Sequence, residues 1–278
     1  MKKITRRSFL AAAGLTAAAL ALTACGGSSS STASSTASSA ASSEAASSSA
    51  AAELTTVEAG KLTMATNATF PPYEMTTDTG AFEGIDVDTA QAIAEKLGLE
   101  LQIDDMEFDA ALLSVQQGKA DIVMAGVTVT DERKAVMDFS DSYATGIQSI
   151  IVPEGSDIAT PDDLAGKKIG TQRGTTGYIY CTDDFGEDAV VAYDSGLTAV
   201  QALNNGQVDA VVIDNAPAQE YVAANPGLVV LDTSYAEEDY AIGMAKGSAL
   251  EDAINAALEE LKADGTLQSI VDKYITAE

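Results

Sequence analysis

The stretch QQGKADIV, residues 116–123, returns in outline 88 positions later as NNGQVDAV, residues 204–211. Each copy has a polar pair, a glycine, two further residues, an aspartate and then the apolar residues of a buried strand. Helix-like patterns precede both copies, so each glycine indicates the end of a helix. A spacing of nearly one small domain predicts two α/β lobes of similar build, although a match this short can also arise by chance.

The repeat also aligns two strand ends. The same offset pairs Gly126 with Asp214, and both follow apolar, strand-like residues. Open parallel sheets bind ligands at the C-terminal ends of their strands. The pairing therefore predicts a carboxylate from one lobe opposite exposed backbone from the other.

The composition excludes several classes of function. The 278 residues are 46% hydrophobic and 21% charged, which suits a soluble globular protein of one or two domains. With 15 Lys and Arg against 42 Asp and Glu, the formal net charge is -27, so no nucleic-acid partner is expected. Histidine is absent, which removes Ser-His-Asp and Cys-His catalysis and His-ligated zinc. We predict no catalytic residue, no metal site and no cofactor.

The N-terminus has the pattern of an export signal. MKKITRRSFL is cationic, and the apolar run AAAGLTAAALAL is too short to span a bilayer, which needs about 20 residues. LTAC, residues 22–25, resembles the bacterial lipobox, in which cleavage precedes a cysteine that carries lipid; a chance cysteine beside a cleavage site is the alternative. We predict a lipoprotein signal peptide over residues 1–24 and a lipid on Cys25. Export would follow the twin-arginine route, which TRRSFL resembles, or the general route.

Residues 25–53 carry this cysteine and a run of Ser, Ala, Thr and Gly that cannot build a core. The run predicts a flexible linker of roughly 30 Å from end to end. The other cysteine, Cys181, is expected to be a small packing residue.

Arg133 lies in TVTDERK, where Thr130 can cap a helix that starts at Asp131. This places Arg133 in the first turn, near the strand end that carries Gly126 and Thr128. The guanidinium can form an ordinary surface ion pair, or it can clamp a carboxylate bidentately with a threonine hydroxyl as second donor. The local sequence leaves both roles open.

In the second lobe, KKIGTQRGTTG runs from a strand into a turn before a helix, where backbone N–H groups can meet an anion, although such turns are common. Together with Arg133 this makes two anion donors on two lobes, and Asp214 adds a counter-charge for a cation. A ligand with both a carboxylate and an ammonium satisfies all three. Phe70, Tyr73 and Phe108 can wall the side chain of such a ligand or pack the core of the lobe.

Several motifs together resemble one family. They are ATNATFPPYE, GIDVDTAQAIAEKLG, DMEFDAALLSVQQGKADIVMAGVTVTDERKAVMDFSDSY, IGTQRGTTG and VDAVVIDNAP. In this order, from residue 61 to the C-terminus, they are similar to polar amino-acid-binding lipoproteins of ABC importers, solute-binding protein family 3. The resemblance implies the type II periplasmic-binding-protein fold, with two α/β sandwich lobes and two crossover strands as a hinge.

The resemblance also implies the lobe boundaries. The first lobe would comprise residues 54–144 and, on the return of the chain, residues 241–278. The second lobe would comprise residues 145–240. The crossings would lie near residues 143–147 and 238–242.

The resemblance assigns the two ends of a bound amino acid. Arg133, Thr128 and the backbone at Thr176 would hold the α-carboxylate of the ligand. Asp214 and the carbonyl of Gly126 would hold its α-ammonium.

The side chain of the ligand would meet a different set of residues. By the same resemblance, Phe70 and Phe108 would sandwich it, and Asn67 and Gln172 would face its tip. Several relatives have an acid where this chain has Asn67, so a neutral polar ligand such as glutamine is preferred over arginine or lysine. If the ligand is cationic instead, another acid such as Glu74 or Asp109 is expected to reach the tip.

The implied function is that of an extracytoplasmic solute-binding protein, not an enzyme. It would capture a polar L-amino acid by closure of the lobes and deliver it to an ABC permease with its ATPase. It would act as a monomer anchored to the bacterial cell membrane through the lipid on Cys25. A ligand-sensing receptor component, or a dehydratase or lytic enzyme on the same fold, remains the alternative.

Overall fold

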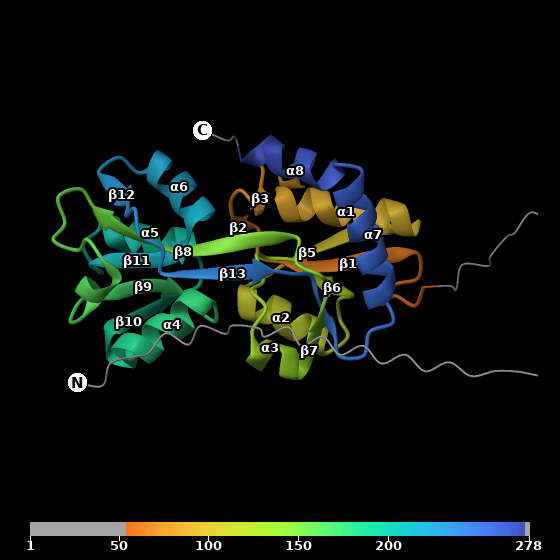
Figure 1. Ribbon diagram of the computed structural model, residues 1–278, viewed down its shortest axis with the longest axis horizontal. Helices are drawn as coiled ribbons and strands as arrows, with labels where there is room; N and C mark the ends of the chain where they lie inside the picture. Colours follow the sequence, from red (N-terminus) through yellow and green to blue (C-terminus); the bar gives the residue numbers. More distant parts are fainter. Residues whose placement is uncertain (1–53, 276–278) are drawn as a thin grey trace, which may run out of the picture. The chain divides into compact units, whose positions relative to one another are not determined.

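Two mixed sheets organise the protein in the computed structural model, which describes residues 54–275 (Figure 1). The first sheet has the strand order β5-β1-β6-β14-β7. Its strands are β1 (Lys61–Thr66), β5 (Glu100–Asp105), β6 (Ile122–Val123), β7 (Met137–Phe139) and β14 (Gly243–Ala245). The second sheet has the order β10-β9-β11-β8-β12, and β13 also pairs with β8. Its strands are β8 (Ala144–Pro153), β9 (Ile169–Gln172), β10 (Val190–Tyr193), β11 (Ala210–Asp214), β12 (Leu228–Val230) and β13 (Ala236–Tyr240).

One strand in each large sheet, β1 in the first and β9 in the second, is parallel to both of its neighbours. In the first sheet β1 pairs in parallel with β5 and β6, and in the second β9 pairs in parallel with β10 and β11. All residues of β9 and β11 are buried, as expected for parallel strands covered by helices on both sides. A small third sheet has the order β2-β3-β4 and consists of β2 (Thr69–Phe70), β3 (Glu74–Thr76) and β4 (Phe82–Glu83).

The helices fall into two groups, one around each large sheet (Figure 1). The first group consists of α1 (Ile85–Leu97), α2 (Phe108–Gln116), α3 (Asp131–Val136), α7 (Glu251–Ala263) and α8 (Thr266–Tyr274). The second consists of α4 (Thr176–Phe185), α5 (Gly196–Asn204) and α6 (Asn215–Ala224), with short 3₁₀ turns at Pro161–Leu164 and Glu187–Ala189. Ion pairs of Lys96 with Glu260 at 3.0 Å and of Lys273 with Asp88 at 2.7 Å join the two C-terminal helices to α1.

The repeated plan is confirmed in its local geometry. The helices that precede the two repeated strands, α2 and α5, are each nine residues long. The glycines that follow them, Gly118 and Gly206, have φ values of 66° and 67°. This left-handed conformation strongly favours glycine, so the same residue ends both helices for the same reason.

The aspartate of each repeat also has one role in both lobes. Asp121 accepts a hydrogen bond from the backbone N–H of Thr63 in β1 at 2.8 Å. Asp209 accepts one from the backbone N–H of Lys168, just before β9, at 2.7 Å. Each carboxylate therefore ties the start of its own strand to the neighbouring parallel strand, β6 to β1 and β11 to β9.

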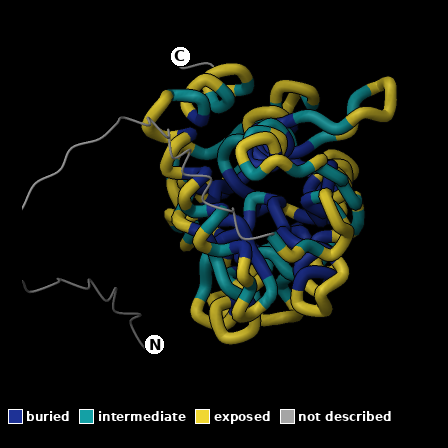
Figure 2. Tube along the Cα trace, turned by 90° about the vertical axis from the view of Figure 1, so that its right-hand side faces the viewer, coloured by how far each residue is buried: buried dark blue, intermediate teal, exposed yellow. Residues whose placement is uncertain are grey.

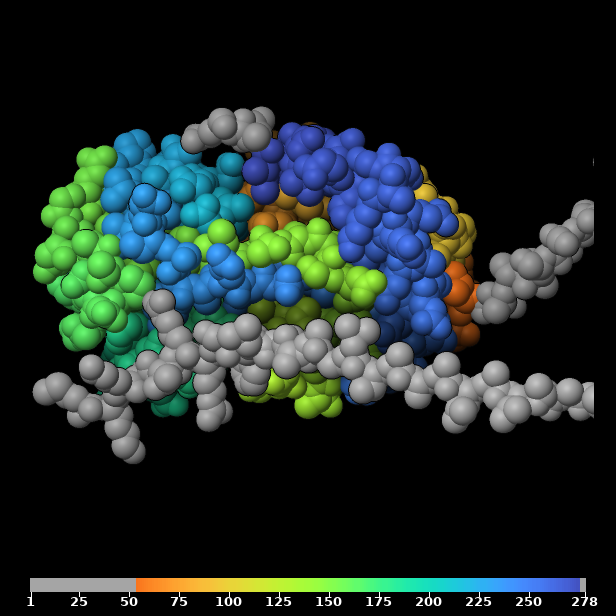
Figure 3. Space-filling view, in the orientation of Figure 1, coloured from red at the N-terminus to blue at the C-terminus, as the bar shows by residue number. Residues whose placement is uncertain are grey.

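Two antiparallel strands connect the sheets. The chain leaves the first sheet after β7 and enters the second at β8, and it returns between β13 and β14. Strands β8 and β13 pair from Ala144 with Tyr240 to Gln148 with Ala236, and Figure 3 shows them side by side on the surface. Alternate residues of β13 face inward, so Glu238 and Tyr240 are buried while Glu237 and Asp239 are exposed.

Figure 2 shows the buried residues gathered inside the protein under exposed loops. Cys181 is one of them, packed with apolar side chains of the second sheet. Burial raises the pKa of its thiol to about 12, which confirms the expected packing residue. No helix within residues 54–275 is both long enough and apolar enough to cross a bilayer. The predicted signal peptide, Cys25 and the linker lie outside the described residues.

Candidate ligand-binding site

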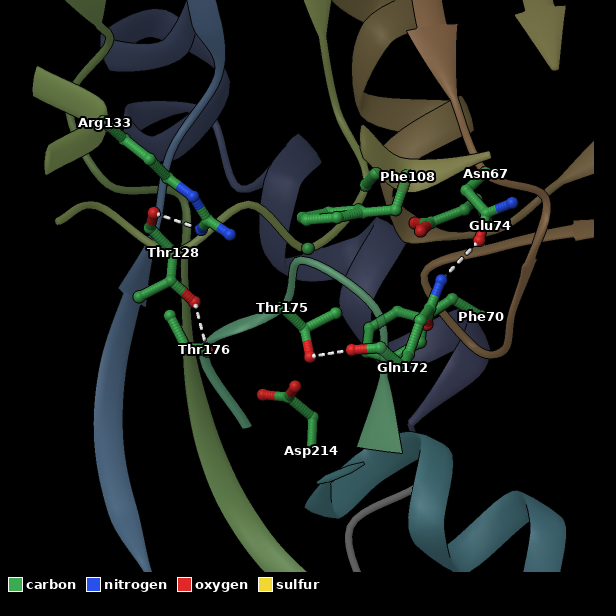
Figure 4. Close-up of a pocket in the computed structure, with 12 residues that line it drawn as sticks. Asn67, Phe70, Glu74, Phe108, Thr128, Arg133, Gln172, Thr175, Thr176 and Asp214 are labelled. Atoms are coloured by element: carbon green, nitrogen blue, oxygen red, sulfur yellow. Dashed lines mark hydrogen bonds between the residues drawn. The ribbon is translucent and has the colours of Figure 1, made fainter. Parts of the chain in front are cut away.

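A pocket opens where strand ends of the two large sheets approach each other (Figure 4). It encloses about 320 Å³ of space, its open mouth included, which suits a single small molecule. Every ligand-binding residue implied by the family resemblance lines it, and three further residues were not assigned to the site. The lining consists of Asn67, Phe70, Glu74, Phe108, Ala125, Gly126, Thr128, Arg133, Gln172, Thr175, Thr176 and Asp214.

Arg133 lies in the first turn of α3, where the predicted cap is confirmed because the Thr130 side chain accepts a hydrogen bond from the Arg133 N–H. The side chain of Arg133 is buried, and none of the salt bridges within residues 54–275 includes it. Its Nη1 donates to the carbonyl of Thr128 at 2.7 Å, and its Nη2 donates to the carbonyl of Gly174 at 3.2 Å. The surface ion-pair interpretation is therefore wrong. Carbonyls hold the guanidinium without neutralising it and leave further N–H donors unused.

Beside this guanidinium, two threonine hydroxyls converge on one acid from the hinge. Thr128 Oγ1 and Thr176 Oγ1 donate to Glu238 Oε2 at 3.1 and 3.0 Å. Gln148 Nε2 donates to the same oxygen at 2.9 Å and to Asp214 Oδ2 at 2.8 Å. The sequence interpretation did not assign Glu238 or Gln148 to the site. Their inward orientation follows only from the pairing of β8 with β13.

Asp214 ends β11 and is buried at the bottom of the view in Figure 4. Besides Gln148, the phenol of Tyr240 donates to its carboxylate. Burial, together with the negative charge of Glu238, raises the pKa of Asp214 to about 7. A nearby ammonium would favour the charged form of this carboxyl and lower its pKa again.

Aromatic rings wall the pocket and also belong to the core, so both interpretations of Phe70 and Phe108 hold. The guanidinium carbon of Arg133 lies 5.3 Å from the centre of the Phe108 ring. Tyr73 does not line the pocket; it packs edge-on against Tyr240 with ring centres 5.2 Å apart. Gly126 has a φ of 54°, and an added Cβ would lie 2.9 Å from the Phe70 ring. The backbone at this strand end can thus approach the aromatic wall only without a side chain.

Asn67 and Gln172 line the pocket, but they are bonded to each other across the lobes. Gln172 Nε2 donates to Asn67 Oδ1 at 2.8 Å. Asn67 Nδ2 donates to the carbonyl of Met106 at 2.9 Å, and the Thr69 hydroxyl donates to Asn67 Oδ1 at 3.1 Å. The Asn67 amide is therefore largely occupied by the protein itself.

Glu74 is the group in the pocket that most needs a partner. Its residue is 1% exposed, and neither carboxyl oxygen has a hydrogen-bond partner. Burial and the neighbouring Asp86 raise the pKa of Glu74 well above its ordinary value. Asp109, the other acid considered from the sequence, is exposed and does not line the pocket. No periodic pattern singles out Glu74, because β2 and β3 are too short to show one.

The pocket thus has a basic group and an acidic group on opposite sides. Figure 4 shows Arg133 at one side and Glu74 at the other, with the Phe108 ring between them. Asp214 lies below this line on the second lobe. Within residues 54–275, no group of three or more His, Cys, Asp or Glu side chains is placed to hold a metal ion. The arrangement suits an organic ion with separated charges.

We expect Glu74→Gln to raise the free energy of unfolding of the ligand-free protein at pH 8 by about 1–3 kcal/mol, the usual cost of an unsatisfied buried polar group. The gain should be smaller at pH 5. The folded-state pKa of Glu74 is raised, so the folded wild type binds its proton more tightly than the unfolded chain and loses stability as the pH rises above about 4.5. A glutamine side chain at position 74 does not titrate, so it adds no such pH dependence to the stability of the variant. Urea unfolding at both pH values measures the difference.

The matched control is Glu95→Gln, which removes the same charge from an exposed position on α1. It should change the stability little at either pH. A gain for Glu74→Gln that is larger at pH 5 than at pH 8 would contradict the described state of Glu74.

Comparison with known proteins relates this chain to one protein family. The model of bacterial extracellular solute-binding proteins, family 3, matches residues 62–277. The L-cystine-binding protein TcyJ of Escherichia coli is 34% identical over 226 residues, which cover 80% of this chain and 85% of that protein.

Solved structures agree in fold. An ancestral arginine-binding protein bound to glutamine superposes with a TM-score of 0.75 at 42% identity, over 78% of this chain and 99% of that one. An ancestral arginine-binding protein bound to arginine gives a TM-score of 0.74 at 43% identity, over 78% and 98%. These matches confirm the predicted two-lobe α/β fold. The family is one of solute-binding proteins, which supports the expectation of a non-enzymatic role. The chain therefore belongs to the bacterial extracellular solute-binding proteins of family 3.

Proposed function

We propose that this protein captures one L-amino acid between its lobes and delivers it to an ABC permease. The observation that carries the proposal is the chemistry of one pocket, which has donors for a carboxylate on one side and a buried acceptor for an ammonium below them. Arg133 has N–H groups to spare, and Asp214 is a buried carboxyl that a cation would stabilise. Relatives named for cystine and for arginine, and a solved structure with bound glutamine, support an amino acid as the ligand.

In this proposal the carboxylate of the ligand binds Arg133 and the backbone at Thr176, and the Thr128 hydroxyl turns from Glu238 to donate to it. Thr176 begins α4, where backbone N–H groups have no partner within the helix and the dipole favours an anion. The ammonium binds Asp214 and the carbonyl of Gly126. The pocket wall of Phe70 and Phe108 covers the aliphatic part of the side chain.

The ligand that the pocket fits best is a basic amino acid, arginine first. A guanidinium would bring charge and N–H donors to the two unpartnered oxygens of Glu74. This replaces the preference for a neutral ligand that the sequence suggested, which rested on Asn67. The amide of Asn67 is already bonded to Gln172 and Met106, so it is a weaker candidate for selecting the ligand.

Capture occurs by closure of the lobes. Besides the Asn67–Gln172 pair, the Tyr221 hydroxyl donates across the lobes to the carbonyl of Thr69 at 2.5 Å, and Arg133 bonds the carbonyl of Gly174. A ligand that contacts groups of both lobes adds to this set only when the lobes are closed, so it shifts the population toward the closed state. A permease can then distinguish a loaded protein from an empty one.

We further propose an extracytoplasmic location, with a lipid on Cys25 as the anchor, residues 25–53 as the linker, and a monomeric protein. The family is extracellular, which supports the location. The lipobox-like LTAC and the Ser- and Ala-rich run that follows support the anchor and the linker.

Arg133→Ala should abolish measurable amino-acid binding while the fold persists. Truncating one partner of a buried charge pair usually costs about 2–5 kcal/mol, or roughly thirty- to several-thousand-fold in affinity. Arg133→Lys should also bind the amino acid much more weakly, because one ammonium cannot form the two parallel hydrogen bonds that a guanidinium forms with a carboxylate. Calorimetric titration of L-arginine measures both, and circular dichroism checks the fold.

Arg173→Ala serves as the matched control. This arginine is exposed, does not line the pocket and pairs with Asp194 at 3.7 Å. Its variant should bind as the wild type does. Unchanged affinity in Arg133→Ala would remove the carboxylate clamp from the proposal.

Cys25→Ala should release the protein from the membrane without changing its ligand affinity. A lipid supplies its membrane affinity through buried CH₂ groups, about 0.8 kcal/mol each, and alanine cannot carry one. Fractionation of the producing cells, with the pocket variant Arg133→Ala as a control that stays anchored, measures the effect. Retention of Cys25→Ala in the membrane fraction would show that something other than this lipid holds the protein.

A further inference from the structure

Two buried carboxyl groups lie together at the side of the pocket away from Arg133. Glu74 is 1% exposed and Asp86 is 0% exposed. The Asp86 N–H donates to the carbonyl of Tyr73, the residue before Glu74, at 2.8 Å, and the charge of the Asp86 carboxyl helps to raise the pKa of Glu74. The Asp86 oxygens also accept hydrogen bonds from the Gly126 N–H at 2.9 Å and the Tyr143 hydroxyl at 2.7 Å. Glu74 has no such donor. Of the two groups, Asp86 is the one equipped to be an anion.

The surroundings of this pair add no positive charge. The charged groups that act on Glu74 within the described residues are acids: Asp86 from α1, Asp214 from β11 and Asp105 from β5. The other titratable groups that face it are the phenols of Tyr73, Tyr143 and Tyr221. Two adjacent carboxylates without a cation, both out of water, cannot both remain ionised at low cost.

We propose that Glu74 and Asp86 hold one proton between them when the closed pocket contains a neutral ligand, and that a cationic side chain takes the place of that proton. The inference rests on the proposed function, and it assigns the pair as the determinant of ligand charge. The proton resides on Glu74, because Asp86 already has two donors.

The two protonation states fit two kinds of side chain. A protonated Glu74 donates its O–H to the carbonyl oxygen of an amide or ureido group and accepts an N–H at its other oxygen. An ionised Glu74 accepts N–H groups of a guanidinium at both oxygens. When the guanidinium enters, the proton of Glu74 leaves to the buffer, so charge in the closed pocket is conserved. One pocket thereby takes both arginine and its neutral analogues.

The consequence is a fixed difference of one proton between the two closed complexes, whatever the state of the empty protein. By linkage, the ratio of the affinity for the cationic ligand to that for the neutral one rises about tenfold per pH unit. This holds while the neutral complex keeps its proton, that is, at pH values below the raised pKa of Glu74. Lower pH favours the neutral ligand in relative terms, and higher pH favours the cationic one.

L-Arginine and L-citrulline form a matched pair of ligands, because they have nearly the same shape and differ in charge. Each is titrated by calorimetry at pH 7 into the wild-type protein in phosphate and in Tris, whose different ionisation enthalpies reveal the number of protons exchanged. We expect arginine binding to release about one more proton than citrulline binding does. The affinity ratio should rise about tenfold from pH 6 to pH 7.

Glu74→Gln tests the assignment to this side chain. The variant should bind arginine more weakly, show no proton difference between the two ligands, and give an affinity ratio that does not change with pH. Glu95→Gln, which removes an exposed acid from the same lobe, should keep the wild-type proton difference. The wild-type titrations need no variant, so a folding defect in Glu74→Gln would not remove the test.

Equal proton counts for arginine and citrulline would overturn the inference and leave amino-acid capture intact. A citrulline affinity too weak to measure at pH 6 would also overturn it. The same holds if the protein binds another amino acid but neither arginine nor citrulline. Persistence of the proton difference in Glu74→Gln would assign the proton to another group and also overturn it. Failure of every amino acid to bind would instead contradict the proposed function.

Discussion

Polar groups buried between the lobes without a full set of partners are the constraint on which the rest of this structure depends. The Arg133 guanidinium is held by two backbone carbonyls, and the Glu74 carboxyl has no hydrogen-bond partner. Taking such groups out of water destabilises the closed protein unless a complementary charge arrives. The closed ligand-free state therefore contains groups that only a ligand can satisfy. Stability is given up at the site that provides the function, as is common in binding proteins.

The hinge takes part in this site and does more than connect the sheets. Strand β13 turns Glu238 and Tyr240 inward, and each of them bonds a pocket residue. Gln148, from the paired strand β8, joins the carboxylates of Glu238 and Asp214 through one amide nitrogen. Of these bonds, the one from the Thr128 hydroxyl to Glu238 joins the first lobe to the hinge, so movement of the lobes about these strands would disturb it. The hinge strands that connect the lobes thus also contribute hydrogen bonds to the ligand pocket.

Much of this arrangement could be predicted from the sequence, because local signals set it. The repeated helix–glycine–strand plan indicated two lobes, and Thr130 with the acids after it indicated the start of the helix that positions Arg133. Residues placed at strand ends by these patterns, such as Gly126 and Asp214, do line one pocket.

What the sequence did not reveal depends on contacts between distant segments. Glu238 lies in AEEDY among other acids, and only the register of β13 against β8 shows which of them faces inward. Glu74 lies in a strand of three residues, where no period can be detected. The preference for a neutral ligand came from the type of residue at position 67. The structure gives a reason to revise it, because the bonds of Asn67 to Gln172 and Met106 already occupy that amide.

The most direct test of this account is a crystal structure of the protein grown with L-arginine. We expect closed lobes, the α-carboxylate of the ligand on Arg133, its ammonium on Asp214, and its guanidinium on both oxygens of Glu74. A ligand bound in the opposite direction, or a guanidinium that leaves Glu74 without a partner and binds at Asn67 and Gln172, would contradict it.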